Sequence, residues 1–486
     1  MALADTAAEG PSPKTSGFGL ATATFVVVAS MIGTGVLTTS GYTVSLVGSN
    51  QLMLALWVVG GVVALCGALT VAELAASLPR SGGDYVYLYE AYGPMAAFLS
   101  GWVSFLIGFG GPIALSAFAA AKYLLVPLHL EESVTPIAQK GVATLAILAF
   151  ALVHSSGRTG TVRVQGGATL LKLGILGLLA VAGLAAGWGR WDHFTDRPPL
   201  ADLPPFLTIV SSFVYISYGY TGWNAATYLA GEIEQPRRRL PQAILLGTGL
   251  VLALYLALNT VYGLALSVED VRRIVDDPSN PHAFKPDAVA PIAQLAAERL
   301  FGRGLSDPFS LAVGLTLLAS VSAYVLTGPR VAYAMARAGQ FPAIAGRLST
   351  RTGTPVIATA LQVAWSLVLL WTGSFDLLLR YSSVGLALFS MLTVSSVYAL
   401  RWRRPDLPRP FSTPGYPVTP AIFLGATGLI VWAVFSESPR VSLYSLASIL
   451  AGVPVYFLWA AFKGRGEGDG RAPGGPGGPR EPDPAG

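Results

Sequence analysis

The 486 residues are 53% hydrophobic and only 12% charged, with a formal net charge of +5. A soluble domain carries about 25% charged residues, so this composition excludes an ordinary soluble protein. The apolar runs are continuous rather than alternating with a period of two residues. They therefore predict an all-α polytopic membrane protein rather than a β-barrel. The basic residues lie mostly in short segments between these runs, which indicates membrane topology rather than nucleic-acid binding.

The apolar runs predict about twelve membrane-spanning helices. In chain order their expected bounds are 17–47, 51–78, 92–126, 136–156, 161–188, 205–233, 239–267, 305–336, 354–373, 375–400, 417–436 and 441–463. The membrane domain is thus expected to cover residues 17–463, after a polar cytoplasmic segment 1–16. The tail 464–486 is rich in Gly and Pro and is expected to be disordered in the cytoplasm.

The distribution of arginine predicts the orientation of these spans. If the N-terminus is cytoplasmic, the inside loops hold Arg80, Arg158, Arg163, Arg237, Arg238, Arg239, Arg330, Arg337, Arg347, Arg351, Arg401, Arg403, Arg404 and Arg409. The outside loops hold Glu131, Glu132 and the mixed segment 268–290. Both termini are therefore expected in the cytoplasm, with the spans in the cell membrane. A short amphipathic helix from Ala288 to Leu300 is expected over the outer mouth.

The first span contains Met31-Ile32-Gly33-Thr34-Gly35. Two glycines around a hydroxyl residue weaken a helix at a point where the bilayer demands one. Free backbone groups are costly in hydrocarbon unless they line a cavity or are buried in protein. This stretch therefore predicts a helix break that binds a ligand, and a close helix-packing site is the alternative.

The sixth span contains a matching sequence, Ser217-Tyr218-Gly219-Tyr220-Thr221-Gly222-Trp223-Asn224. Corresponding breaks in two five-helix halves are typical of an inverted-repeat transporter. The two repeats would cover about 17–188 and 205–400, with two further helices in 417–463. Helix N-termini suit a carboxylate and helix C-termini suit an ammonium group, so two facing breaks predict a zwitterionic ligand.

Lys172 lies about eleven residues into the fifth span, roughly 16 Å from its cytoplasmic start. A charge at that depth normally faces the protein interior and has a partner. The expected partners are carbonyl groups of the first span and hydroxyl groups of the eighth, such as Ser320 or Ser322. Snorkelling to the membrane surface is the alternative.

Six motifs in this order resemble the amino acid–polyamine–organocation (APC) superfamily of amino acid permeases. They are Ile32-Gly33-Thr34-Gly35; Ala72-Glu73-Leu74 with Ser81-Gly82-Gly83-Asp84-Tyr85; Tyr92-Gly93-Pro94; Gly222-Trp223-Asn224 with Ala230-Gly231-Glu232; Arg330 with Tyr333; and Arg409-Pro410-Phe411 with Gly415-Tyr416-Pro417. The resemblance covers most of the chain. It implies the leucine-transporter fold and alternating access around a midplane site.

The resemblance also implies roles for the residues of both breaks. The substrate carboxylate would be bound by the N–H groups of Gly33, Thr34 and Gly35, and the Thr34 hydroxyl would add a hydrogen bond. The substrate ammonium would be bound by carbonyls of Met31, Ile32, Tyr218 and Thr221, and Trp223 and Asn224 would face the side-chain pocket. Sodium-independent members of this family carry a lysine at the point of Lys172, so no sodium requirement is expected.

The predicted function is a secondary active transporter for an amino acid, coupled to protons or working by exchange. A neutral substrate is favoured because Asn224 stands where a carboxylate would recognise a cationic side chain. A cationic amino acid or polyamine transporter and a non-transporting sensor are the alternatives. No enzyme activity, cofactor or metal site is expected, since the four histidines are scattered. The single cysteine, Cys66, lies in an apolar run, so no disulfide-linked partner subunit is expected.

Overall fold

The structure is a computed structural model that describes residues 17–128, 130, 135–185, 189–195, 204–277, 291–372, 375–437 and 439–459. The expected segments 1–16 and 464–486 lie outside the described residues. Within the described part, the regular elements are helices, and a single isolated bridge joins Phe18 to Ile233.

The helices follow one another in chain order and are separated mostly by short connections. They are α1 (Leu20–Met31), α2 (Gly35–Val47), α3 (Asn50–Ser77), α4 (Asp84–Tyr92), α5 (Pro94–Val103), η2 (Ser104–Phe109), α6 (Gly110–Leu125), η3 (Val126–Leu128), α7 (Thr135–Ser155), α8 (Arg158–Ala185), η4 (Trp191–Phe194), α9 (Phe206–Gly219), η6 (Ala225–Glu232), α10 (Pro236–Ala265), α11 (Val268–Asp276), α12 (Ile292–Phe301), η8 (Arg303–Leu305), α13 (Ser306–Thr327), α14 (Pro329–Arg337), η9 (Ala343–Gly346), α15 (Val356–Thr372), α16 (Phe375–Arg403), α17 (Val418–Glu437) and α18 (Pro439–Leu450).

Ten helical segments in the described residues are long and apolar enough to cross a membrane. They are Leu20–Val47, Asn50–Ser77, Pro94–Leu128, Thr135–Ser155, Arg158–Ala185, Pro236–Ala265, Asp307–Arg337, Ser382–Arg403, Val418–Glu437 and Ser442–Trp459. Two shorter apolar helices, α9 and α15, coincide with the sixth and ninth expected spans. The prediction of a polytopic helical membrane protein is confirmed.

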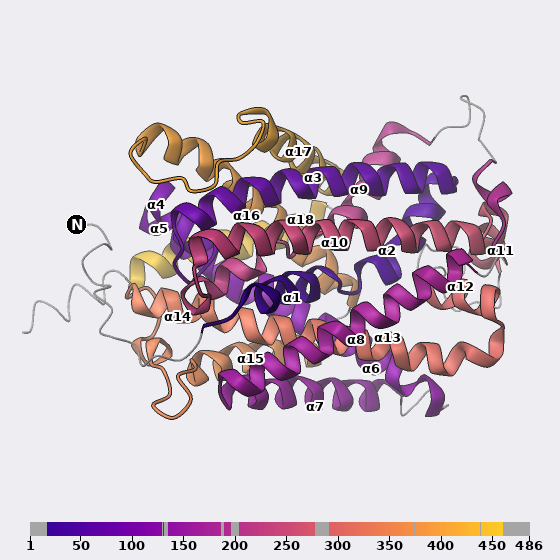
Figure 1. Ribbon diagram of the computed structural model, residues 1–486, viewed down its shortest axis with the longest axis horizontal. Coiled ribbons are helices and arrows are strands. Elements are labelled where there is room, and N and C mark those ends of the chain that lie inside the picture. Colours follow the sequence, from indigo (N-terminus) through magenta and orange to yellow (C-terminus); the bar gives the residue numbers. More distant parts are fainter. Residues whose placement is uncertain are drawn as a thin grey trace, which may run out of the picture.

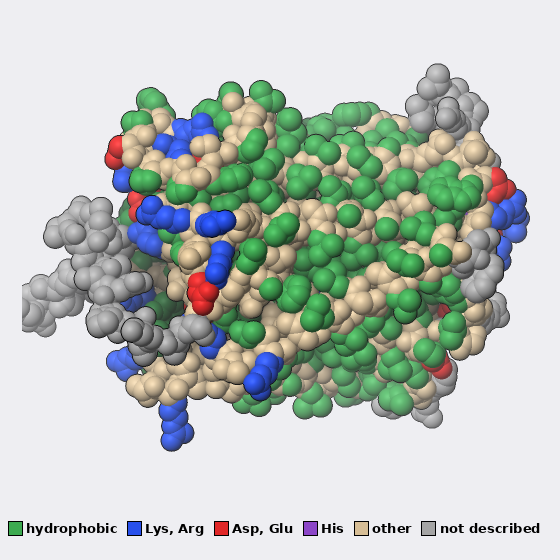
Figure 2. All heavy atoms as spheres, in the orientation of Figure 1, with side chains coloured by type: hydrophobic (Ala, Val, Ile, Leu, Met, Phe, Trp, Pro, Cys, Tyr) green, Lys and Arg blue, Asp and Glu red, His purple; other side chains and the backbone are tan. Residues whose placement is uncertain are grey.

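The outer surface of the bundle suits a lipid environment. The long helices lie side by side along the longest axis, with α11 and α12 at one end and α14 and the start of α1 at the other, called here the N-terminal end (Figure 1). Hydrophobic side chains cover the middle of the bundle, and Lys and Arg gather at the N-terminal end (Figure 2). Leu152 of α7 is 72% exposed and Leu178 of α8 is 69% exposed. Side chains of this kind favour lipid tails over water.

Short polar and glycine signals determine where helices near the ends of the bundle begin and stop. Gly48 ends α2 with a φ of 61°, and the Ser49 hydroxyl accepts a hydrogen bond from the Leu52 amide at the start of α3. Ser267 and Asp270 form a reciprocal capping box at the start of α11. The amphipathic helix expected at 288–300 corresponds to α12, which begins at Ile292; residues 288–290 lie outside the described residues.

The expected third span consists of α5, η2 and α6 in direct succession. The middle piece, η2, is a π-helix of six residues from Ser104 to Phe109. Single π-helical turns inside α-helices occur frequently at functional sites. Here the π-helix and the first turn of α6 supply Ser104, Gly108, Phe109 and Pro112 to the wall of a cavity.

Candidate functional site

The first span is discontinuous, as the sequence predicts. α1 ends at Met31 and α2 begins at Gly35, with Ile32 at φ −78° and ψ 85° between them. The Met31 carbonyl accepts hydrogen bonds from the Tyr255 hydroxyl at 2.8 Å and from the Gly33 amide at 2.9 Å. The end of α1 is therefore stabilised by a side chain of α10 and by a local turn.

The second break lies where the sequence predicts it, between Gly219 and Ala225. α9 ends at Gly219, a turn follows, and the chain continues as the 3-10 helix η6. The Thr221 amide and hydroxyl donate to the Tyr218 carbonyl at 3.1 and 2.8 Å. The Gly219 carbonyl accepts from the Tyr255 hydroxyl at 3.0 Å, so one tyrosine contacts carbonyl groups of both breaks.

The two breaks pack directly against each other. A Cβ atom on Gly35 would lie 2.5 Å from the Gly219 Cα atom. A Cβ atom on Gly222 would lie 2.8 Å from the Ser30 carbonyl oxygen, and the φ of Gly222 is 102°, which other residues rarely adopt. Glycine at these positions lets the breaks approach each other.

Lys172 is fully buried and makes the contacts that the sequence predicts with α1 and α13. Its ammonium donates to the Ser320 hydroxyl at 2.7 Å, to the Ala29 carbonyl at 3.2 Å and to the Ile32 carbonyl. Ser320 in turn donates to the Ile32 carbonyl at 2.7 Å. The three N–H bonds of the ammonium thus have three acceptors, and the α8 side chain links α1 to α13.

Ser322 does not share this site with Lys172. Its hydroxyl donates to the Gln165 side-chain oxygen at 2.7 Å and lies 2.9 Å from the buried His154 ring. Ser320 and Ser322 are two positions apart on α13, and residues at that spacing do not share a face of a helix. Of the two serines that the sequence suggests, only Ser320 contacts the lysine.

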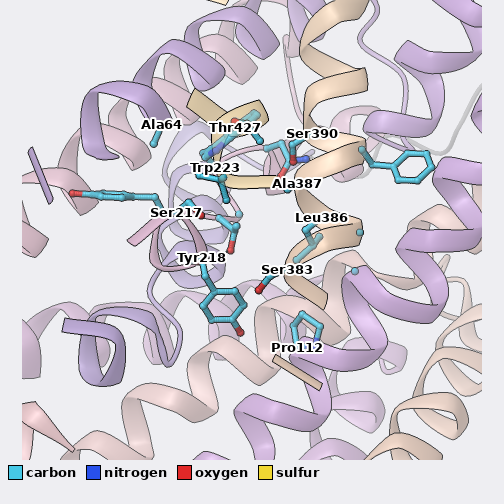
Figure 3. A pocket seen from close by; sticks show the side chains of 18 of the residues that line it. Ala64, Pro112, Ser217, Tyr218, Trp223, Ser383, Leu386, Ala387, Ser390 and Thr427 are labelled. Carbon is cyan, nitrogen blue, oxygen red and sulfur yellow. Dashed lines mark hydrogen bonds between the residues drawn. The ribbon is translucent and has the colours of Figure 1, made fainter. Parts of the chain in front are cut away.

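A cavity of 140 Å³ lies beside the second break. This is close to the cavity of about 150 Å³ that holds benzene in an engineered protein, so the space suits a small molecule. Figure 3 shows Tyr218 and Trp223 on the opposite side from Ser383 and Leu386 of α16. Most of the remaining wall is apolar and comes from α3, η2, α6 and α17, and α1, α4, α5 and α13 supply one residue each.

The cavity brings together some of the candidate site residues but not all. Its lining includes, from the predicted site, Tyr218, Tyr220, Thr221, Gly222, Trp223 and Asn224. Ser30 lines it from the first break, whereas Met31, Ile32, Gly33, Thr34 and Gly35 lie outside the lining. Trp223 packs edge-on against Phe423 of α17 at 5.8 Å between ring centroids, which positions its indole in the wall.

Asp84 was not predicted as a site residue, yet its carboxylate lies beside Asn224, the residue on which the expectation of a neutral substrate rests. It lies at the start of α4, between the spans that end at Ser77 and begin at Pro94, and it lines the cavity at 7% exposure. Asn224 donates to both carboxylate oxygens at 3.1 Å, and the Tyr228 hydroxyl donates to one of them at 3.1 Å.

Burial raises the pKa of Asp84 to about 6, because the charged form loses its hydration. The hydrogen bonds from Asn224 and Tyr228 act in the opposite direction but do not offset the burial. The only signal in the sequence is that Asp84 belongs to the motif Ser81–Tyr85. That motif lies between two apolar runs, so hydropathy gives no reason to place it in the interior.

Two further carboxylates form ion pairs with arginines that lie far away in the chain. Glu73 is buried and pairs with Arg401 at 2.7 Å and with Arg409 at 3.5 Å. Glu232 pairs with Arg330 at 3.0 Å. These pairs join segments far apart in the chain near the N-terminal end of the bundle. Within the described residues, no group of three or more His, Cys, Asp or Glu side chains could hold a metal ion.

Comparison with known proteins finds similarity over most of the chain. A family model described as amino acid permease matches residues 18–458. The human large neutral amino acids transporter small subunit 2 is 29% identical over 445 residues, covering 90% of this chain and 79% of the relative. The human cystine/glutamate transporter is 28% identical, covering 89% and 83%. The mouse Asc-type amino acid transporter 1 is 28% identical, covering 90% and 80%. The chain therefore belongs to the amino acid permease family, within the APC superfamily, whose members are membrane transporters and not enzymes.

Proposed function

We propose that this protein moves a neutral L-amino acid across the cell membrane by alternating access. The observation that carries the proposal is the direct packing of two helix breaks beside a cavity with room for a small molecule. Backbone N–H groups at one helix start and carbonyls at other helix ends complement the two charges of an α-amino acid. Relatives named as amino acid transporters support this assignment.

Both breaks take part in recognition of the zwitterion in this proposal. The amides of Thr34 and Gly35 belong to the start of α2, where a helix leaves its first N–H groups without an intrahelical acceptor. Together with the Thr34 hydroxyl, these amides would bind the substrate carboxylate. The Gly33 amide would join them if its hydrogen bond to the Met31 carbonyl opens. The Ile32 carbonyl is engaged by Lys172 and Ser320, and the Tyr218 carbonyl accepts from the Thr221 amide and hydroxyl. The Thr221 carbonyl is therefore the favoured partner of the ammonium, and the Tyr218 carbonyl would join it if its turn opens.

The apolar cavity walls favour a neutral side chain over a charged one. The apolar side chains that line it include Val63, Ala64, Phe423 and Ile430. One relative is named for large neutral amino acids, which agrees with this preference. A cationic amino acid or polyamine is the second candidate, and the observation that favours it is the Asp84 carboxylate in the same cavity.

The proposal includes no sodium requirement. Lys172 supplies a fixed positive charge between α1 and α13, where a bound cation would otherwise link the two helices. Transport would then be driven by protons or by exchange against a second amino acid. One relative is named for two substrates, cystine and glutamate, as an exchanger would be.

We further propose twelve spans, with α9 and α15 added to the ten long segments, and two inverted five-helix repeats. The first break lies in the first span and the second in the sixth, as such repeats require. Both termini would be cytoplasmic, in agreement with the Lys and Arg at the N-terminal end of the bundle (Figure 2). Cys66 is 8% exposed, so we infer that no disulfide-linked partner subunit is attached.

Thermal unfolding of the purified protein with each of the twenty amino acids tests the substrate class. A ligand that binds the folded state raises the melting temperature by mass action. Each amino acid that stabilises the protein is then tested for counterflow in proteoliposomes, with sodium replaced by choline. Counterflow without sodium is the expected result. Binding without counterflow would identify a sensor, and the absence of any stabilising amino acid would contradict the proposal.

A further inference from the structure

We propose that the Asp84 carboxylate is a proton-binding site, which takes up one proton together with the neutral amino acid. This inference rests on the transport function proposed above. On the outward-open side, one proton binds the carboxylate and gives the neutral acid. On the inward-open side, the acid releases that proton, so one proton moves with each substrate molecule.

The hydrogen-bond partners of Asp84 are all uncharged. Asn224 and Tyr228 donate to it, and within the described residues no Lys or Arg forms an ion pair with it. The closest arginine along the chain, Arg80, pairs instead with Glu90. A buried carboxylate without a cation is costly, so it favours either a proton or a positively charged ligand.

The surroundings of Asp84 favour the proton. Tyr87 of α4 and Tyr228 of η6 are the titratable groups that face it, and tyrosines keep their protons below an ordinary pKa of about 10. From α16 the adjacent side chain is the uncharged Thr393. The ring of Phe109 in η2 lies edge-on to Tyr228 at 5.1 Å. The rest of the cavity wall is mainly apolar, and the proposed function assigns the substrate ammonium to carbonyls of the second break. The side chain of a neutral amino acid would then bring no counter-charge to the carboxylate.

Protonation of Asp84 would alter the second break through Asn224. The ionised carboxylate is an acceptor only, and the Asn224 amide donates to both of its oxygens. A protonated carboxyl gains an O–H donor and loses its charge, so the hydrogen bonds that it accepts from Asn224 and Tyr228 become weaker. Asn224 is the last residue before η6, so this change acts on the turn from Tyr220 to Asn224. Proton binding and the geometry of the substrate site are coupled by this contact.

Lys172 is less suited to release a proton in each cycle. Its ammonium has three acceptors, two of which are backbone carbonyls that cannot donate in return. Loss of a proton would leave a buried acceptor facing a lone pair, at a cost comparable to a lost hydrogen bond. Asp84 and Lys172 therefore divide the roles of proton carrier and fixed charge.

The pH dependence of L-leucine uptake into proteoliposomes tests the proposal, with Asp84→Asn as the variant. A group with a pKa of about 6 is roughly 25-fold more protonated at pH 5.5 than at pH 7.5. The wild type should therefore take up more leucine at external pH 5.5 by up to about that factor. In Asp84→Asn, leucine uptake should be about equal at the two pH values. The matched control is Asp192→Asn, which changes an exposed aspartate in η4 and should keep the wild-type ratio.

Two measurements keep the test decisive if Asp84→Asn does not fold. Tyr228→Phe retains the acid and removes a donor that stabilises its charged form, so the midpoint of the uptake profile should move to higher pH. In weakly buffered solution, the wild type should take up about one proton for each leucine bound.

The outcomes separate this inference from the transport function. Leucine counterflow that is independent of pH, with no proton uptake, would overturn the role of Asp84 and leave the transport function intact. Uptake of lysine or arginine that depends on Asp84 without proton movement would assign the carboxylate to substrate recognition instead. Absence of counterflow for every amino acid would overturn the transport function itself.

Discussion

Replacement of Lys172 by Met should destabilise the protein and disable transport, because it removes the link between α1 and α13. The variant keeps an unbranched side chain but loses hydrogen bonds to Ala29, Ile32 and Ser320. Bonds from a charged donor contribute roughly 1.5–3 kcal/mol each. The variant also regains the several kcal/mol that burial of the charge costs in the wild type. Because Ser320 still donates to Ile32, a net loss of about 2–4 kcal/mol is expected.

The assay is thermal unfolding of the detergent-purified protein, followed by intrinsic fluorescence, together with counterflow. At about 2 °C per kcal/mol for a large chain, the melting temperature should fall by roughly 4–8 °C. Lys122→Met is the matched control, since that lysine is exposed on α6. Normal stability and normal counterflow in Lys172→Met would refute the reasoning, because the buried ammonium would then have no structural role.

Two further substitutions test the packing around the breaks. Gly222→Ala forces a Cβ atom to within 2.8 Å of the Ser30 carbonyl at a φ of 102°, and should lower stability by about 1–3 kcal/mol and reduce counterflow at least tenfold. Gly249→Ala, in an open position on α10, is its control; equal effects of the two would contradict this account. Glu73→Gln removes the charge opposite Arg401 and should lower the melting temperature, with a loss of about 2 kcal/mol. Since Glu73 lies outside the cavity, leucine affinity should be unchanged, and a weakened affinity would argue against a structural role.

The sequence by itself determined the membrane class, the ten long apolar segments and the two breaks. A spanning helix satisfies its backbone hydrogen bonds within its own segment. The spans can therefore be located from the hydropathy of each segment alone. The two breaks also follow from a local property, because glycine has a low helix propensity. The glycines concerned are Gly33, Gly35, Gly219 and Gly222. Lys172 could be assigned to the interior because a charge at that depth has few other solutions.

The tertiary structure alone decided which polar groups meet. Asp84 lies between two spans in sequence, and only the packing of α4 against α16 and the hydrogen bonds from Asn224 and Tyr228 hold it in the cavity. Ser320 and Ser322 have the same chemistry, and the rotation of α13 selects the first as the partner of Lys172. Hydropathy indicates which segments lie in the membrane, but it does not indicate which neighbour a side chain faces. The partners are set by helix rotation and by contacts between residues more than a hundred positions apart.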